Sequence, residues 1–298
     1  MGRLSRHVIA ALFAASAMTC SAASAKPSPR ELEPTSKWLM DYRDNSCRLS
    51  RQFGAGDEQI LLMLSQYGPS DAFRVTVAGK PTKVLFSRSM KVQFGPNEEV
   101  QTVIAEEGTL GKYPALLFAR AMTVAKSEPD AEYKFSDPST WQRSAPPTSE
   151  QLAGVRNLTI GVGRSRPLVL KTGSLSKPFE ALTTCVDNLV KSWGLDPAIV
   201  KTLTRGATPE SDPGNWIRSS DYPQGMLMAR QPAIVNFLLN VDANGAVTKC
   251  TIQETTYPKA FDDAVCNAVT KRGRFKPALD ANGQAVASYW QRTVRFVL

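Results

Sequence analysis

The sequence has a single histidine, His7, and that residue lies in a segment that we expect to be removed. A positively charged start precedes an apolar run from Val8 to Met18, and small residues then lead to Ala23-Ser24-Ala25. This order is typical of a cleavable signal peptide, which we place at residues 1–25. The mature chain would then hold no imidazole, which excludes Ser-His-Asp triads, Cys-His pairs and histidine-ligated metal sites. We therefore expect a protein that is not an enzyme and has no cofactor.

Long apolar runs are otherwise absent. The run in the signal segment is too short to span a bilayer as a permanent helix, and nothing later in the sequence approaches a transmembrane run. Cys20 raises the alternative of a lipoprotein signal, but Ala17-Met18-Thr19 before it fits the usual Leu-Ala-Gly pattern poorly. The sequence therefore predicts export to the periplasm, with cleavage after Ala25.

Cysteines in C-x-x-C spacing are also absent, which excludes a zinc knuckle and a thioredoxin-type redox site. Without the signal peptide four cysteines remain: Cys47, Cys185, Cys250 and Cys266. Redox or metal chemistry is one interpretation, and structural disulfides are the other. An even number of cysteines in an exported protein favours disulfides.

The sequence shows no nucleotide or nucleic-acid motif. Gly161-Val162-Gly163 lacks the third glycine and the following helix of a dinucleotide fingerprint. The chain carries 36 Lys and Arg against 27 Asp and Glu, for a formal charge of +9, but these residues are scattered. Export also argues against nucleic acid. Anionic lipid head groups could attract such a surface, so we expect membrane contact to be peripheral if it occurs.

The length favours two domains joined by a polar linker rich in proline and glycine. We place the linker at residues 204–216, after a first domain at 26–203. Most of that domain consists of short apolar segments separated by turn residues, which predicts a mostly antiparallel β module, a sandwich or barrel. The predicted strands are Ile60–Leu64, Phe73–Val77, Lys91–Phe94, Leu158–Val162 and Pro167–Leu170. The stretch from Gly111 to Ala119 fits a strand or a short helix equally well.

One helix is predicted late in the first domain, at about residues 177–193. Its apolar residues recur every three or four positions, with Ser176 as the expected N-cap and Gly194 as the expected end. Cys185 lies beside the apolar stripe. Cys47 is the only other cysteine in this domain, so we expect the two to pair and join the helix to the first ordered segment.

The last quarter of the sequence alternates strand, turn and helix signals. Ala233 to Val241 has a strand pattern, and Asn244-Gly245 then favours a hairpin because both positions tolerate positive φ. A second strand is expected at about Val247 to Thr255. Helical spacing begins at Phe261, and a final strand carries Trp290, Val294 and Phe296 on one face.

These residues resemble the C-terminal domain of the TonB family of energy transducers. The family pattern has Tyr-Pro before the first strand, a strand ending in Asp-x-x-Gly, a Leu-Asp-x-Ala helix start, Phe-x-Pro-Ala followed by Asn/Asp-Gly, and a closing strand that ends in Phe. In this sequence they are Tyr222-Pro223, Asp242–Gly245, Phe261–Ala264, Phe275–Ala278 with Asn282-Gly283, and Val294–Phe296. The resemblance covers about residues 215–298.

The resemblance implies a small β-β-α-β domain at 217–298, and hence an α+β protein. It also implies that the edge of the last strand accepts an extended segment of an envelope or outer-membrane transport protein. The candidate partner-binding residues are Tyr222, Pro223, Tyr289, Gln291, Thr293, Arg295 and Val297. The alternative is that the chain's own first domain covers this edge. Because the helix would pack on the second strand, Cys250 and Cys266 are expected to form a disulfide.

The sequence departs from an energy transducer in two respects. A transducer keeps its N-terminal membrane helix and has a long proline-rich spacer, whereas this chain has a cleavable signal and a folded domain. We therefore expect a periplasmic binding protein. A transducer that retains its N-terminal segment as an anchor is the first alternative, and an enzyme with an unrecognised site in the first domain is the second.

Overall fold

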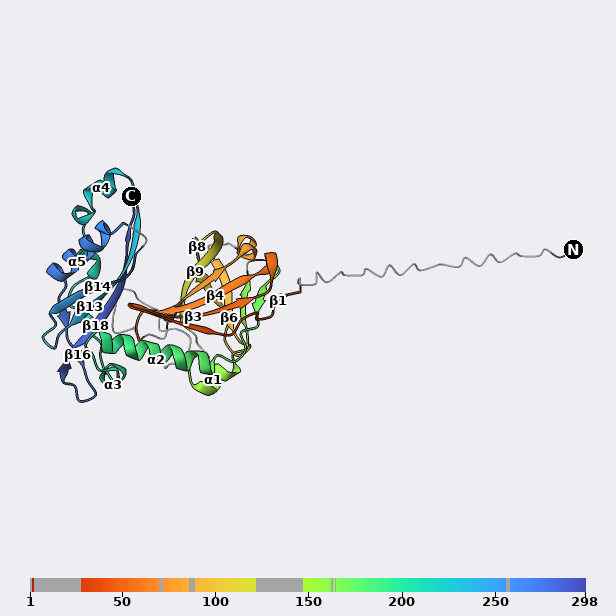
Figure 1. Ribbon diagram of the computed structural model, residues 1–298, viewed down its shortest axis with the longest axis horizontal. Helices are drawn as coiled ribbons and strands as arrows, with labels where there is room; N and C mark the ends of the chain where they lie inside the picture. The colour runs from red at the N-terminus through yellow and green to blue at the C-terminus, as the bar shows by residue number, and fades with distance from the viewer. Residues whose placement is uncertain are drawn as a thin grey trace.

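The buried apolar side chains form two main clusters, one in each part of the chain. The computed structural model describes residues 2, 28–69, 72–85, 89–121, 147–161, 163, 165–255 and 258–298. Apart from Gly2, the predicted signal peptide lies outside the described residues. One cluster draws on residues between Leu32 and Leu189, and the other on residues between Ala207 and Phe296. We call residues 28–203 the N-terminal part and 204–298 the C-terminal part; Figure 1 shows them side by side in an α+β fold.

The first sheet of the N-terminal part has six antiparallel strands in the order β2-β3-β4-β5-β9-β8. Their bounds are β2 (Leu39–Arg43), β3 (Ser46–Phe53), β4 (Ile60–Gln66), β5 (Ala72–Ala78), β8 (Glu106–Leu110) and β9 (Tyr113–Ala121). The apolar run that predicts β4 is inside the protein, with Ile60, Leu62 and Leu64 fully buried. The stretch from Gly111 to Ala119, whose sequence fits a strand and a helix equally well, contributes most of β9.

The second sheet has five strands in the order β1-β11-β10-β6-β7. Their bounds are β1 (Arg30–Leu32), β6 (Ser89–Phe94), β7 (Gln101–Ile104), β10 (Leu158–Gly161) and β11 (Leu168–Leu170). Only β1 and β11 pair in parallel among these described strands. Phe73 of β5 meets Phe94 of β6 at 5.7 Å between ring centroids, so the two sheets share one core. The predicted mostly antiparallel module is therefore a sandwich.

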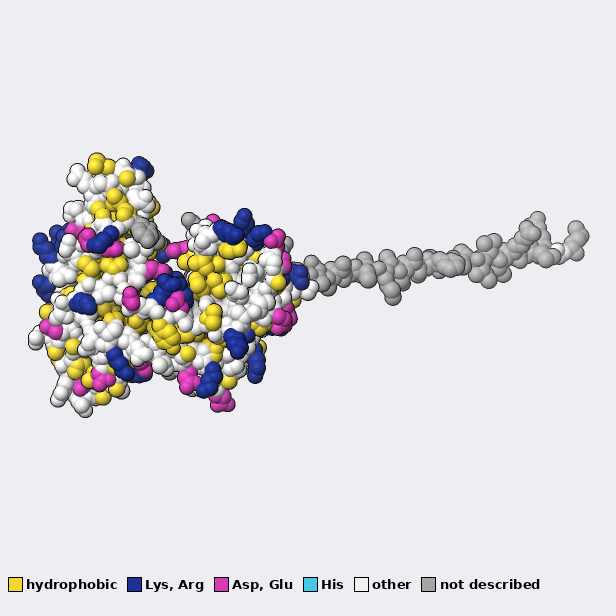
Figure 2. Space-filling model, viewed as in Figure 1, with side chains coloured by type: hydrophobic (Ala, Val, Ile, Leu, Met, Phe, Trp, Pro, Cys, Tyr) yellow, Lys and Arg dark blue, Asp and Glu magenta, His cyan; other side chains and the backbone are white. Residues whose placement is uncertain are grey.

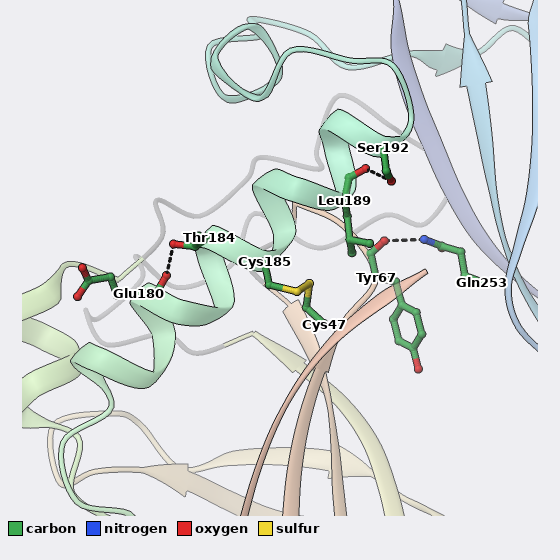
Figure 3. The surroundings of a disulfide bond; sticks show 8 residues. All are labelled: Cys47, Tyr67, Glu180, Thr184, Cys185, Leu189, Ser192 and Gln253. Carbon is green, nitrogen blue, oxygen red and sulfur yellow. Dashed lines mark hydrogen bonds between the residues drawn. A yellow bond between two sulfur atoms is a disulfide. The ribbon is translucent and has the colours of Figure 1, made fainter. Parts of the chain in front are cut away.

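Helix α2 (Ser176–Ser192) lies along this sandwich and buries one stripe, as its spacing predicts. Cys185 on that stripe forms a disulfide with Cys47 of β3 (Figure 3). The predicted N-cap was wrong: Ser176 is the first helical residue, and Leu175 occupies the N-cap position without a capping side chain. Gly194, with φ of +79°, ends the helix as predicted. Two short helices flank it, α1 (Ser149–Gly154) and α3 (Pro197–Lys201).

The C-terminal part contains a three-stranded antiparallel sheet in the order β14-β13-β18, with one helix on it. The bounds are β13 (Ala233–Val241), β14 (Val247–Thr255), α5 (Ala260–Arg272) and β18 (Ser288–Phe296). Phe261, Val265 and Val269 of α5 are buried against the sheet. A disulfide joins Cys250 of β14 to Cys266 of α5. The predicted strand-strand-helix-strand order is present.

Residues 204–216, predicted to be a linker, are packed within the C-terminal part, against residues 275–279. β12 (Thr208–Pro209) pairs with β15 (Phe275–Lys276), and the Thr204 amide donates to the Leu279 carbonyl at 2.9 Å. Trp216 is 3% exposed and stacks edge-on against Phe275. The remaining elements here are the hairpin of β16 (Ala278–Leu279) with β17 (Ala285–Val286), the turns η4 (Pro213–Asn215) and η5 (Ser219–Asp221), and the helix α4 (Gln224–Met228).

Two turns of the C-terminal part have the same sequence, Asp-Ala-Asn-Gly, and the same hydrogen bonds. In the first, the carboxylate of Asp242 accepts the amides of Asn244 and Ala246, both at 2.9 Å. In the second, Asp280 accepts the corresponding two amides at 2.8 Å. The predicted hairpin at Asn244-Gly245 is present, and of the residues in each turn only the glycine has positive φ. The aspartate, which satisfies two turn amides, is what closes these turns.

Candidate functional site at the edge of the C-terminal sheet

β18 lies at one edge of the three-stranded sheet, where the resemblance places the site. Its nine residues pair with β13 from Ser288↔Val241 to Phe296↔Ala233, and among the described strands β13 is its one partner. Trp290 and Phe296 belong to the cluster under α5. Since side chains alternate along a strand, the odd-numbered residues of β18 point to the opposite face, toward the N-terminal part.

The first half of this odd-numbered face is in contact with the tip of the β4–β5 hairpin. The Tyr289 hydroxyl donates to the Pro69 carbonyl at 2.8 Å, and the Gln291 amide donates to the Tyr67 carbonyl at 2.7 Å. The Tyr289 ring also lies 5.2 Å from the Trp193 ring, between centroids. Two of the predicted partner-binding side chains therefore already bind the N-terminal part.

The second half of the face opens toward solvent. Thr293 donates its hydroxyl to the side-chain oxygen of Asn236 at 2.5 Å. Arg295 forms an ion pair with Glu106 of β8, across the boundary between the two parts. Val297, just beyond the strand, is 75% exposed. The face thus changes from covered to open along the strand.

A polar cluster around Glu254 of β14 secures the same boundary on the same face of the sheet, nearer its opposite edge. The Tyr67 hydroxyl donates to the Glu254 carboxylate at 2.7 Å, and Arg74 forms an ion pair with it. Asn236 adds a third donor to this carboxylate at 3.2 Å. Burial raises the pKa of the Tyr67 phenol above its usual value, and the hydrogen bond to Glu254 acts in the same direction. Tyr67 therefore remains a neutral donor.

Further contacts across the boundary use main-chain carbonyls as acceptors. Gln253 donates to the Tyr67 carbonyl at 2.5 Å (Figure 3), and Asn240 donates to the Trp193 carbonyl at 2.8 Å. In the reverse direction, Asn45 of the β2–β3 turn donates to the Ile252 carbonyl at 3.1 Å. These contacts were not predicted, because each joins segments that lie far apart in the sequence. The sequence did carry one signal for these contacts, which is the presence of amide side chains on a face of the sheet that would otherwise be apolar.

Tyr222 and Pro223, the other predicted partner-binding residues, have structural contacts of their own. The Tyr222 ring packs edge-on against Phe261 at 5.5 Å and Phe296 at 5.3 Å, and its hydroxyl donates to the Gln231 carbonyl at 2.7 Å. Pro223 precedes α4 as its N-cap residue. The pair therefore fixes the approach to β13 and lies near the last residues of β18.

Both predicted disulfides are confirmed. Cys47 and Cys185 are buried, with sulfurs 2.02 Å apart, and Cys250 and Cys266 are joined at the same distance. All four cysteines are consumed, so none of them is available as a free thiol. Within the described ranges no three His, Cys, Asp or Glu side chains are grouped to hold a metal ion, and no helix is long and apolar enough to cross a membrane.

The N-terminal part has a cavity of about 480 Å³ near its first strand. It is lined by Arg30, Glu58, Pro81, Leu85, Ser165, Arg166 and Leu168. Arg30 forms an ion pair with Glu58, and Arg166 donates to the Ser28 and Pro29 carbonyls at 2.6 and 3.1 Å. These charged groups hold the start of the described chain in place, and they present no nucleophile with an adjacent base. That the protein is not an enzyme stays a prediction.

Comparison with known proteins supports the assignment of the C-terminal part. Residues 218–298 match the family model described as Gram-negative bacterial TonB protein C-terminal, which confirms the resemblance drawn from the motifs. The match includes β13, β14, α5 and β18 and leaves the N-terminal part unassigned. A search among curated proteins found no match. In coarse terms, the family and the two disulfides fit an exported protein of the Gram-negative envelope with an envelope protein as partner.

Proposed function

We propose that this protein is a periplasmic, non-enzymatic binding protein that adds an extended segment of an envelope or outer-membrane transport protein to β18. The observation that carries this proposal is a nine-residue edge strand, paired with β13 alone among the described strands, in a domain that matches the TonB C-terminal model. In strand addition the main-chain hydrogen bonds supply affinity, and alternate side chains supply specificity. This mode of binding needs no catalytic group.

The opposite edge of the sheet is a poorer candidate. Asn45 already donates to a main-chain carbonyl of β14, and Gln253 and Glu254 of that strand bind the β4–β5 hairpin. A segment that paired with β14 would have to displace the Asn45 side chain from this main-chain carbonyl. The contacts that we find on β18 come from its side chains. These project from the faces of the sheet, whereas an added strand would lie in the plane of the sheet beside β18.

A peptide selection followed by amide exchange tests the proposal. Heptapeptides are selected from a phage-displayed random library on residues 26–298, and the best is synthesised. We expect it to slow hydrogen exchange at β18 amides and to leave β14 amides unchanged, because only the edge that gains a strand gains hydrogen bonds.

Two N-methylated versions of the selected peptide provide the matched control. In one version the methyl groups replace the N–H hydrogens that face β18, and in the other they replace those that face solvent. The side chains are the same in both versions. We expect one version to lose binding and the other to retain it. Equal binding by both versions, or protection located away from β18, contradicts strand addition.

A further inference from the structure

The open end of β18 faces a second sheet edge, which belongs to the N-terminal part. β8 is the last strand of the six-stranded sheet, and β18 is the last strand of the three-stranded sheet. The ion pair between Arg295 and Glu106 joins these two edge strands directly. Figure 2 shows a notch between the two parts of the protein, and Figure 1 places the C-terminus on one side of it and β8 on the other.

Each member of this ion pair has an exposed apolar neighbour two residues away. Val297 follows Arg295 on the odd-numbered face and is 75% exposed. On the other side Ile104 is 79% exposed, while Val103 and Ala105 next to it are buried in the core. Ile104 ends β7 of the five-stranded sheet and Glu106 begins β8 of the six-stranded sheet, with only the buried Ala105 between them. The burial of Val103 and Ala105 leaves Ile104 on the solvent side, next to the strand that carries Glu106. We use the name interdomain notch for the surface formed by Ile104, Glu106, Arg295 and Val297.

The two walls of the interdomain notch are held at a fixed separation by contacts deeper in the boundary. The ion pair contributes little to this, because its side chains are 58% and 42% exposed and water screens them. The anchors are the part-buried Tyr67–Glu254 hydrogen bond and the contacts of Tyr289 with Pro69 and Trp193. A segment that enters the notch therefore binds between two walls whose separation is already fixed. Binding loses no free energy in bringing these walls together.

We propose that the N-terminal part supplies the second wall of the peptide site, with Ile104 and Val297 contacting one apolar side chain of the bound segment. The inference rests on the proposed function, since it assumes that the segment lies along β18. A strand beside β18 points alternate side chains toward the N-terminal part, and at the open end those side chains reach the two exposed β-branched residues. The partner is accordingly an extended segment with an apolar residue, valine or isoleucine in size, at this position. A charged residue there would lose hydration without gaining a partner.

Fluorescence anisotropy with labelled heptapeptides tests this inference. The probes are an alternating Thr-Val peptide and the same peptide with each valine changed in turn to aspartate. For the wild-type chain we expect a single valine position at which aspartate weakens binding roughly tenfold or more. The substitution Ile104→Asp should weaken the all-valine peptide to a similar extent and should abolish the difference at that position.

Two variants separate a specific effect from a general one. Val297→Asp, on the other wall, should weaken binding as Ile104→Asp does, whereas Leu39→Asp, at an apolar residue of β2 that is 61% exposed, should leave it unchanged. All three positions are exposed, so the variants are expected to fold, and circular dichroism checks this.

The outcomes distinguish this inference from the proposed function. If Ile104→Asp binds as the wild type does while N-methylation still abolishes binding, strand addition stands and the second wall is refuted. If the wild type binds none of the peptides, the proposed function fails and the inference fails with it. If sedimentation shows that the wild type self-associates and that Ile104→Asp abolishes the association, the occupant of the notch is a second copy of this chain and the inference is overturned.

Discussion

Gly245 and Gly283 end two turns of identical sequence, yet their surroundings differ. A Cβ at Gly245 would lie 1.8 Å from the Phe275 carbonyl oxygen, whereas one at Gly283 would meet nothing within 4 Å. Both have positive φ, which costs other residues about 1–2 kcal/mol. Gly245→Ala should therefore lower the free energy of unfolding by about 3 kcal/mol or more, since main chain must also move.

Gly283→Ala is the matched control for this substitution, because the same turn carries the same backbone penalty without the clash. We expect it to cost about 1 kcal/mol. Urea unfolding of both variants gives the comparison, and equal losses would show that the approach of Phe275 to Gly245 has no energetic consequence.

Tyr67 makes the stability of the protein depend on pH in the alkaline range. In the unfolded chain a tyrosine ionises near pH 10, while burial keeps the pKa of folded Tyr67 higher. The contribution of its neutral form is thus complete below about pH 10 and is lost as the pH rises toward the folded pKa. The free energy of unfolding of the wild type, minus that of Tyr67→Phe, should shrink from pH 9 to pH 11. Urea unfolding at the two pH values measures it, and a constant difference would contradict the buried phenol.

At the scale of elements, each disulfide joins a helix to the strand that it covers. The 47–185 pair closes 138 residues and the 250–266 pair closes 16. In the chain-entropy model these loops correspond to about 5 and about 3 kcal/mol. Replacing Cys47 and Cys185 by alanine should therefore destabilise the protein more than replacing Cys250 and Cys266. Denaturant unfolding of the two double variants decides this, and the reverse order would mean that native packing outweighs the loop term.

The elements of the C-terminal part were predictable because their signals are local. Aspartate and glycine mark each turn, and the apolar residues of α5 and β13 repeat with the period of the element. In the N-terminal part β8 has the sequence Glu-Glu-Gly-Thr-Leu and β1 has only three residues, so neither carries a pattern. These strands exist because β9 and β11 offer them partners. Pairing between distant segments is what a single sequence reveals least.

At the scale of the whole molecule, Gly68 is a point of close approach between the two parts. A Cβ there would lie 2.4 Å from the Gln291 amide nitrogen and 2.8 Å from the Trp193 ring. Gly68→Leu should force the β4–β5 hairpin away from β18 and raise the radius of gyration measured by X-ray scattering. Gly154→Leu, where a Cβ meets nothing within 4 Å, is the control. Unchanged scattering from Gly68→Leu would mean that Gln291 and Trp193 yield without moving the parts.

Only half of the candidate site was predictable, because local signals reveal a strand but do not reveal the distant segments that pack on it. The position of β18 at an edge follows from the motifs, and its odd-numbered face follows from alternation. The hairpin that covers Tyr289 and Gln291 lies more than 200 residues away in sequence, and only the fold brings it there. The N-terminal part covers the side chains of Tyr289 and Gln291, and the binding of an external segment along the edge of β18 stays a prediction.

Four hydrogen bonds across the boundary between the two parts join a side-chain donor to a main-chain acceptor. Asn240, Gln253, Tyr289 and Gln291 all donate from the C-terminal sheet, and their acceptors are main-chain oxygens of Tyr67, Pro69 and Trp193. Any residue carries such an oxygen, so these four hydrogen bonds depend on the course of the chain, whereas the Tyr67 hydroxyl and the Asn45 amide donate in the reverse direction from their side chains. During evolution the donors should be the constrained positions, and unrelated domains that offer a similar hairpin could be exchanged in front of the same sheet.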